Sequence, residues 1–187
     1  MSTTASPSTL IPTGTWNVDP AHSKVGFGVK HMGIATVRGE FTEFAGTLEI
    51  GEDLANANAH GTVKTQSVDT NEPQRDDHLR SPDFFDAAQY PELRFESTKI
   101  ETLDTEEFRI TGNLTIHGIT NQIILHADYQ GTDTDPWGNQ RIALEITGQL
   151  SRGDYGMKFN QALGSGNVLV ADKVKLALDI SAVKQSA

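Results

Sequence analysis

Residues 142–150 have the sequence IALEITGQL, in which every second residue except Gly148 is large and apolar. Because successive side chains of a strand point to opposite faces of the sheet, this stretch predicts a β-strand with one apolar face. The same alternation recurs at 16–18, 25–29, 93–95, 108–116 and 174–180. Weaker strand patterns separated by turn residues cover 36–50, 61–68 and 122–130. The sequence therefore predicts an all-β chain with eight or nine antiparallel strands.

The length of these strands favours a closed barrel over a sandwich. Several contain about ten alternating residues, or roughly 30 Å at the usual rise per residue. Their predicted inner faces also include Gly112 and Gly148, which we expect to leave unfilled space. A barrel of about eight strands can be filled by side chains or can hold one ligand. We expect one extended antiparallel barrel with a ligand in its interior.

Two segments depart from the strand pattern. Residues 72–90 predict a short helical insert, in which Pro73 opens one helical turn and Pro82 marks the start of a second. This insert is expected to cover an open end or a flank of the sheet. Residues 1–13 are rich in Ser, Thr and Pro and predict a disordered tail, so the folded domain is predicted to span 14–187.

Composition excludes several classes of protein. The chain has 187 residues, no cysteine and a formal net charge of −10, which disfavours nucleic-acid binding because phosphate contacts need clustered Lys and Arg. No apolar run reaches the roughly 18 residues of a membrane-spanning helix. The N-terminal residues lack the basic and apolar parts of a secretion signal, so a cytoplasmic protein is expected. The oligomeric state is left open, with a homodimer among the alternatives.

Four stretches of sequence resemble a known family. They are WNVDPAHS at 16–23, RDDHLRSPDFFD at 75–86, GNLTIHGIT at 112–120 and SRGDYGM at 151–157. In this order they resemble the YceI-like proteins. The resemblance implies an extended, lipocalin-like barrel with a helical flank, whose interior binds isoprenoid chains or other long amphiphiles. Gly14, Thr15 and Trp16 are also similar to the Gly-x-Trp of lipocalin first strands, in which the Trp plugs the closed end.

Apolar residues on the predicted inner faces and in the insert are therefore the candidate ligand-binding residues. A long tail gains about 0.8 kcal/mol for each buried CH₂ group and needs no specific polar partner. The expected ligand is a polyprenyl chain, an isoprenoid quinone or a fatty-acid-like lipid. The candidates are Phe27, Val29, Phe41, Phe44, Phe84, Phe85, Phe95, Leu114, Ile116, Leu144, Ile146, Leu176 and Leu178. The alternative is that they fill a solid core, as in a structural or interaction module.

Polar candidates are fewer. Arg75, His78 and Arg80 in the insert are candidates for the polar head of the ligand, and Arg suits a phosphate. Arg152 and Asp154 are expected to form a structural pair at a barrel end. The six histidines raise the alternative of a metal or haem protein, but none has the close spacing of paired ligands. No catalytic motif occurs, so we expect a binding or carrier protein without a cofactor, and not an enzyme.

Overall fold

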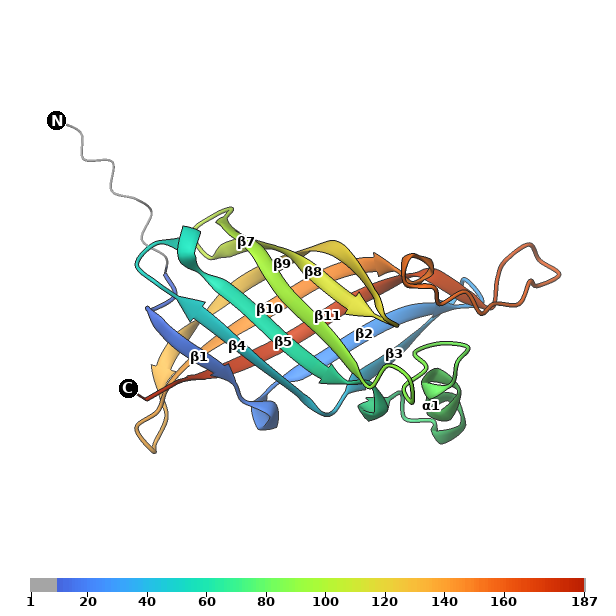
Figure 1. The fold of residues 1–187 in the computed structure, drawn as a ribbon, viewed down its shortest axis with the longest axis horizontal. Helices are drawn as coiled ribbons and strands as arrows, with labels where there is room; N and C mark the ends of the chain where they lie inside the picture. Colours follow the sequence, from blue (N-terminus) through green and yellow to red (C-terminus); the bar gives the residue numbers. More distant parts are fainter. Residues whose placement is uncertain (1–9, 187) are drawn as a thin grey trace.

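The computed structural model describes residues 10–186, and eleven strands form one sheet (Figure 1). The strands are β1 (Gly14–Val18), β2 (Lys24–His31), β3 (Ala35–Phe41), β4 (Phe44–Ile50), β5 (Asn58–Lys64), β6 (Val68–Asp69), β7 (Glu92–Thr102), β8 (Glu107–Ile116), β9 (Ile119–Thr134), β10 (Gln140–Ser151) and β11 (Val170–Lys184). The described helices are α1 (Pro73–Arg80) and the 3₁₀ turns η1 (Pro20–His22), η2 (Leu54–Asn56), η3 (Thr65–Ser67) and η4 (Arg152–Tyr155).

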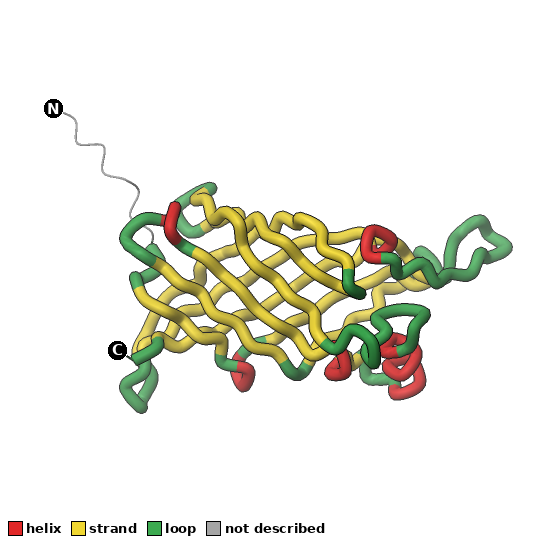
Figure 2. The backbone as a smooth tube through the Cα atoms, in the orientation of Figure 1, coloured by secondary structure: helices red, strands yellow, loops and turns green. Residues whose placement is uncertain are grey.

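The sheet closes on itself as an antiparallel barrel. Its order is β1-β4-β5-β7-β8-β9-β10-β11, and β1 also pairs with β11 to complete the ring of eight. Strands β2, β3 and β6 prolong this ring toward α1, because β11 pairs with β1 only at residues 182–184 and with β2 between Val170 and Asp179. The β11 strand has 15 residues, which gives it a length of about 50 Å. The predicted all-β barrel of about eight strands is confirmed, and Figure 2 shows how completely strands make up its wall.

The insert holds one helix, where the sequence pattern predicted two. Glu72 accepts a hydrogen bond from Gln74 N at the start of α1, and Pro73 is its first residue, as predicted. The second helix start, at Pro82, is wrong. Ser81 ends α1, and the chain turns back so that Phe85 N and Ala87 N donate to the Leu79 and Arg80 carbonyls. These bonds satisfy the free carbonyls of α1 and leave no straight path for a new helix.

The end of the barrel at which β1 begins and β11 ends is filled with side chains. Trp16 is fully buried there, and its indole Nε1 donates to the carbonyl of Pro12 at 3.0 Å. It packs in a cluster with Phe108, Ile142 and other residues of β7 to β11. Ile11, from the segment predicted as a disordered tail, is buried in the same cluster, while residues 1–9 of that segment lie outside the described residues. Trp16 therefore closes this end, as the lipocalin-like pattern predicts.

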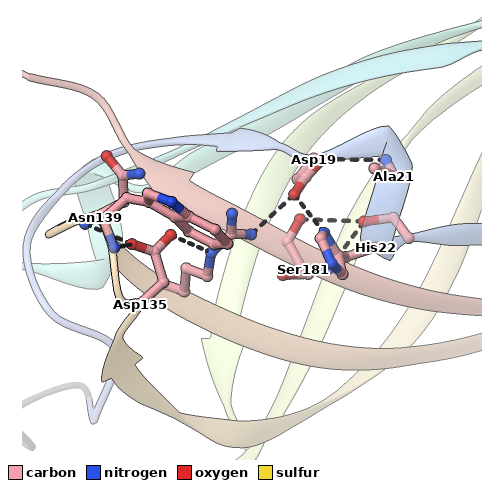
Figure 3. Close-up of polar contacts among 9 residues, drawn as sticks. Asp19, Ala21, His22, Asp135, Asn139 and Ser181 are labelled. Carbon is pink, nitrogen blue, oxygen red and sulfur yellow. Dashed lines mark hydrogen bonds and ion pairs between the residues drawn. The ribbon is translucent and has the colours of Figure 1, made fainter.

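An ion-pair network fastens the outside of this closed end (Figure 3). Arg141 Nη1 donates to Asp19 and its Nε donates to Asp135, both at 2.8 Å. The bond from Arg141, followed by the one from His22, holds the pKa of Asp19 at about 2. Burial raises the pKa of Asp135, but the bonds from Arg141, Asn139 and Trp137 outweigh it and lower that pKa to about 2. The network ties the turn after β1 to the β9–β10 hairpin.

Candidate functional site

A cavity of about 460 Å³ lies inside the barrel, and its lining runs from residues of the filled end to residues of α1. This volume is in the range of small-molecule pockets. Ile110, Leu144 and Ala182 line its deep part, and His31, Arg152 and Val170 belong to its α1 end. Trp16, Phe108 and Ile142 do not line it, because they fill the opposite end. The barrel is therefore solid at one end and hollow toward the other.

All of the apolar residues predicted to contact a ligand line this cavity. They come from β2, β3, β4, β7, β8, β10, β11 and the insert, so strands distant in the sequence contribute to one apolar surface. Sequence reasoning did not single out the remaining apolar lining residues, although many of them continue the same alternation. These are Val18, Val25, Val37, Ala45, Leu48, Ala59, Val63, Leu79, Leu93, Ile110, Ile123, Leu125, Leu150, Met157, Leu169, Val170, Val174, Ile180 and Ala182.

The two glycines that were expected to leave space do not border the empty volume. A Cβ atom at Gly112 would lie 2.4 Å from the Phe95 ring, and one at Gly148 would lie 2.6 Å from Leu125 Cδ2. Neighbouring side chains have filled both positions. Gly61 differs, because a Cβ atom there would meet only backbone atoms of β4 within 4 Å. The open space therefore lies over Gly61, beside Ala59 on the same strand.

Aromatic residues of the insert cover the α1 end of the cavity. Phe85 packs against Phe41 of β3, with 5.6 Å between ring centroids. The His78 ring meets Phe84 and Phe159 edge-on, at 5.0 and 4.8 Å, and its Nε2 lies 2.8 Å from Asp83. His78 thus reaches the cavity as part of an aromatic cluster that covers one end of the barrel.

The arginines predicted to receive a polar head differ in position. Arg75 lines the cavity, but its Nε and Nη2 donate to the hydroxyl and carbonyl of Thr70 at 2.7 and 2.8 Å. Arg80 is not among the lining residues, so its prediction as a head-group residue is not supported by its position. Its donors bind the carbonyls of Gln66 and Val68, and this fastens α1 to the end of the barrel.

Arg152 was predicted to pair with Asp154, and this prediction is wrong. Its guanidinium is buried and donates to the carbonyls of Met157, Val170 and Ala171 at 2.8 to 3.2 Å. Burial lowers the pKa of Arg152, and the nearby charge of Asp172 opposes that shift. The side chain lines the cavity and holds the loop after η4 in place. The spacing of charged residues in the sequence does not indicate this role of Arg152, because its partners are backbone carbonyls.

The histidines do not gather into a site. His22 bonds to Asp19, and His117 Nδ1 donates to the carbonyl of Tyr155. Within residues 10–186, the one group of three residues with metal-ligand geometry is Glu107, His126 and Asp128, which contains a single histidine and lies partly exposed. This arrangement gives no support to a haem or multi-histidine centre. Within the same range, no helix has the length and apolarity needed to cross a membrane.

Comparison with known proteins agrees with this geometry. The YceI-like domain pattern matches residues 16–182. Protein YceI of Escherichia coli O157:H7 is 36% identical over 165 residues, covering 88% of this chain and 83% of the relative. Burkholderia cenocepacia BcnA has a similar fold, with a TM-score of 0.75 at 22% identity over 88% of this chain and 98% of that one.

A second solved structure shares the fold at lower identity. It is a polyisoprenoid-binding domain from Saccharophagus degradans, with a TM-score of 0.68 and 14% identity over 93% of this chain and the whole of that one. At this identity the likeness concerns the fold alone. The family pattern, together with the identity to protein YceI, decides the relationship. The chain belongs to the YceI-like family.

Proposed function

We propose that this protein binds and carries a long-chain isoprenoid or a similar amphiphilic lipid, with the apolar tail inside the barrel, and that it is not an enzyme. The observation that carries the proposal is the apolar cavity of about 460 Å³, closed at its deep end by the Trp16 cluster. The polyisoprenoid-binding domain of S. degradans, which shares the fold, supports the same class of ligand.

The chemistry of the lining favours a tail over a compact polar ligand. Leu, Ile, Val and Phe side chains predominate, and the cations among the lining residues lie mainly toward the α1 end. Each CH₂ group removed from water contributes about 0.8 kcal/mol, so affinity is expected to grow with tail length until the cavity is full. Arg75 and His78 are the proposed contacts for the polar head, since both lie at the α1 end of the lining.

Native mass spectrometry of the protein purified from its own host tests this proposal. The expected result is a stoichiometric lipid, which extraction and fragmentation then identify. The apo protein should also take up retinol, a fluorescent isoprenoid alcohol, with one site per chain. A protein that arrives empty and binds neither retinol nor a long-chain alcohol would overturn the proposal.

A further inference from the structure

The wall of the barrel is not paired along its whole length. Registered pairing between β9 and β10 runs from Thr134 and Gln140 to His126 and Thr147, and ends there. Beyond that point β9 still pairs with β8, and β10 still pairs with β11. Residues 122–125 of β9 and 148–151 of β10 therefore lie opposite each other without strand pairing. At the usual rise per residue, this unpaired stretch is about 14 Å long. We call this gap the slit.

The slit is bounded at both ends, so it is not a frayed edge. At one end it stops at the pair formed by His126 and Thr147. At the other end, Asn121 Nδ2 donates to the carbonyl of Asp154 at 2.9 Å, and His117 Nδ1 donates to that of Tyr155 at 3.0 Å. These bonds join η4, which follows β10, to the start of β9. The strands can separate between the two fixed points without loss of the barrel.

At the slit, the apolar side chains of Ile123 and Leu150 lie between the cavity and the outside, where the lining also includes polar residues such as Gln122, Gln149 and Ser151. A groove of about 540 Å³ lies along its outer side, and Ile123 and Leu150 line both this groove and the central cavity. Gly148 has no side chain, and Leu125 leans across its position. On the outer surface of β9, the Ile124 side chain is 57% exposed.

The α1 end of the barrel is held more firmly. Arg80 donates to the carbonyls of Gln66 and Val68, and Arg152 binds three carbonyls of the loop and strand that follow η4. A tail that entered there would have to break hydrogen bonds of buried or half-buried charged groups, which are among the stronger ones in proteins. Passage through the slit breaks no strand pair between β9 and β10, and it displaces the apolar contacts of Ile123 and Leu150.

We propose that the slit is a side entrance, through which the apolar tail of the ligand passes between Ile123 and Leu150 into the cavity. The exposed Ile124 gives the tail its first apolar contact on the outer side. This inference rests on the proposed lipid-binding function and adds the route to it. A route affects how fast a ligand enters and leaves, and it leaves the equilibrium affinity unchanged.

A reversible cross-link across the slit tests the route. The chain has no cysteine, so no native thiol competes when Ile124→Cys with Gln149→Cys is oxidised at low protein concentration. These positions would face each other if the pairing of His126 with Thr147 continued by two residues. The matched control is His126→Cys with Thr147→Cys, which links the same strands where they are already paired. The readout is the association and dissociation rate of retinol, measured by stopped-flow fluorescence.

Oxidation of the slit pair should slow both rates at least tenfold, with the dissociation constant unchanged, and reduction should restore them. The control pair should show no such change. Equal rates in the oxidised and reduced slit variant would overturn the route. Failure of the reduced proteins to bind retinol at all would instead count against the proposed function.

A second pair of variants covers the case in which the disulfide does not form. Leu125→Ala removes the side chain that crosses the slit, whereas Leu144→Ala enlarges the same cavity within the paired part of β10. The two leucines are equally buried, at 7% exposure. Retinol association should be at least tenfold faster in Leu125→Ala than in Leu144→Ala. Equal rates in these two variants would also overturn the route.

Discussion

Replacing Ala59 with Phe should shorten the cavity from its deep part. Ala59 lines the cavity on β5, next to the uncovered Gly61, and it already has a Cβ atom that points inward. A phenyl ring there can extend over Gly61 without forcing the backbone apart. If the ring displaces about four CH₂ groups of a bound tail, the loss is about 3 kcal/mol at ~0.8 kcal/mol for each group. That corresponds to roughly 200-fold weaker binding of a tail that fills the wild-type cavity.

The assay is a series of saturated primary alcohols of increasing length that compete with retinol. In the wild type, affinity should rise about fourfold for each added CH₂ and then level off when the cavity is full. In Ala59→Phe the plateau should begin about four carbons earlier, with shorter alcohols unaffected. Lys64→Phe, on the exposed outer face of the same strand and outside the cavity lining, is the matched control. Identical plateaus in a variant that still melts cooperatively would refute the apolar-channel reasoning.

Three further predictions concern stability. Trp16→Ala should lower the free energy of unfolding in urea by about 3–5 kcal/mol, because it empties the centre of the closed end. The pKa of Asp19 is about 2 in the folded protein, so its ionised form contributes about 2 kcal/mol to the free energy of unfolding above pH 4. This contribution should be lost as the pH falls through 2. Urea titrations at several pH values should show that Asp19→Asn removes this loss. Arg152→Met should cost about 3 kcal/mol of stability and speed amide hydrogen exchange in residues 157–171, since three carbonyls lose a charged donor.

The fold and the apolar lining could be predicted because both depend on a two-residue period. Residues such as Phe27, Leu114 and Leu176 lie on the inner face of a strand wherever that strand pairs, so their position follows from the local sequence. The same reasoning reaches Ile110 and Ile180, which continue the pattern. Alternation therefore determines which face a residue occupies before any long-range contact is known.

Contacts that depend on backbone carbonyls could not be predicted. Arg152 was expected to pair with Asp154, and Arg80 to contact a polar head, whereas both bind backbone carbonyls. Since every residue offers a carbonyl, the sequence does not indicate which ones they bind. The same limit explains the error at Pro82. A proline is equally suited to the first turn of a helix and to an ordinary turn, and the bonds from Phe85 and Ala87 to the end of α1 decide between the two.

The two-residue alternation does not determine where empty space remains inside the barrel, because it does not determine side-chain rotamers. Phe95 lies opposite Gly61 on β5 and is diagonal to Gly112 on β8, and its ring can cover either glycine. The Phe95 ring covers Gly112, so the space over Gly61 stays open. In the same way, the Phe27 ring covers Gly39. Both glycines beside Phe95 are inward-facing and equivalent in the sequence pattern. The rotamer of one aromatic side chain therefore determines which of the two glycines has open space over it, and a substitution that turned Phe95 toward Gly61 should move that space to Gly112.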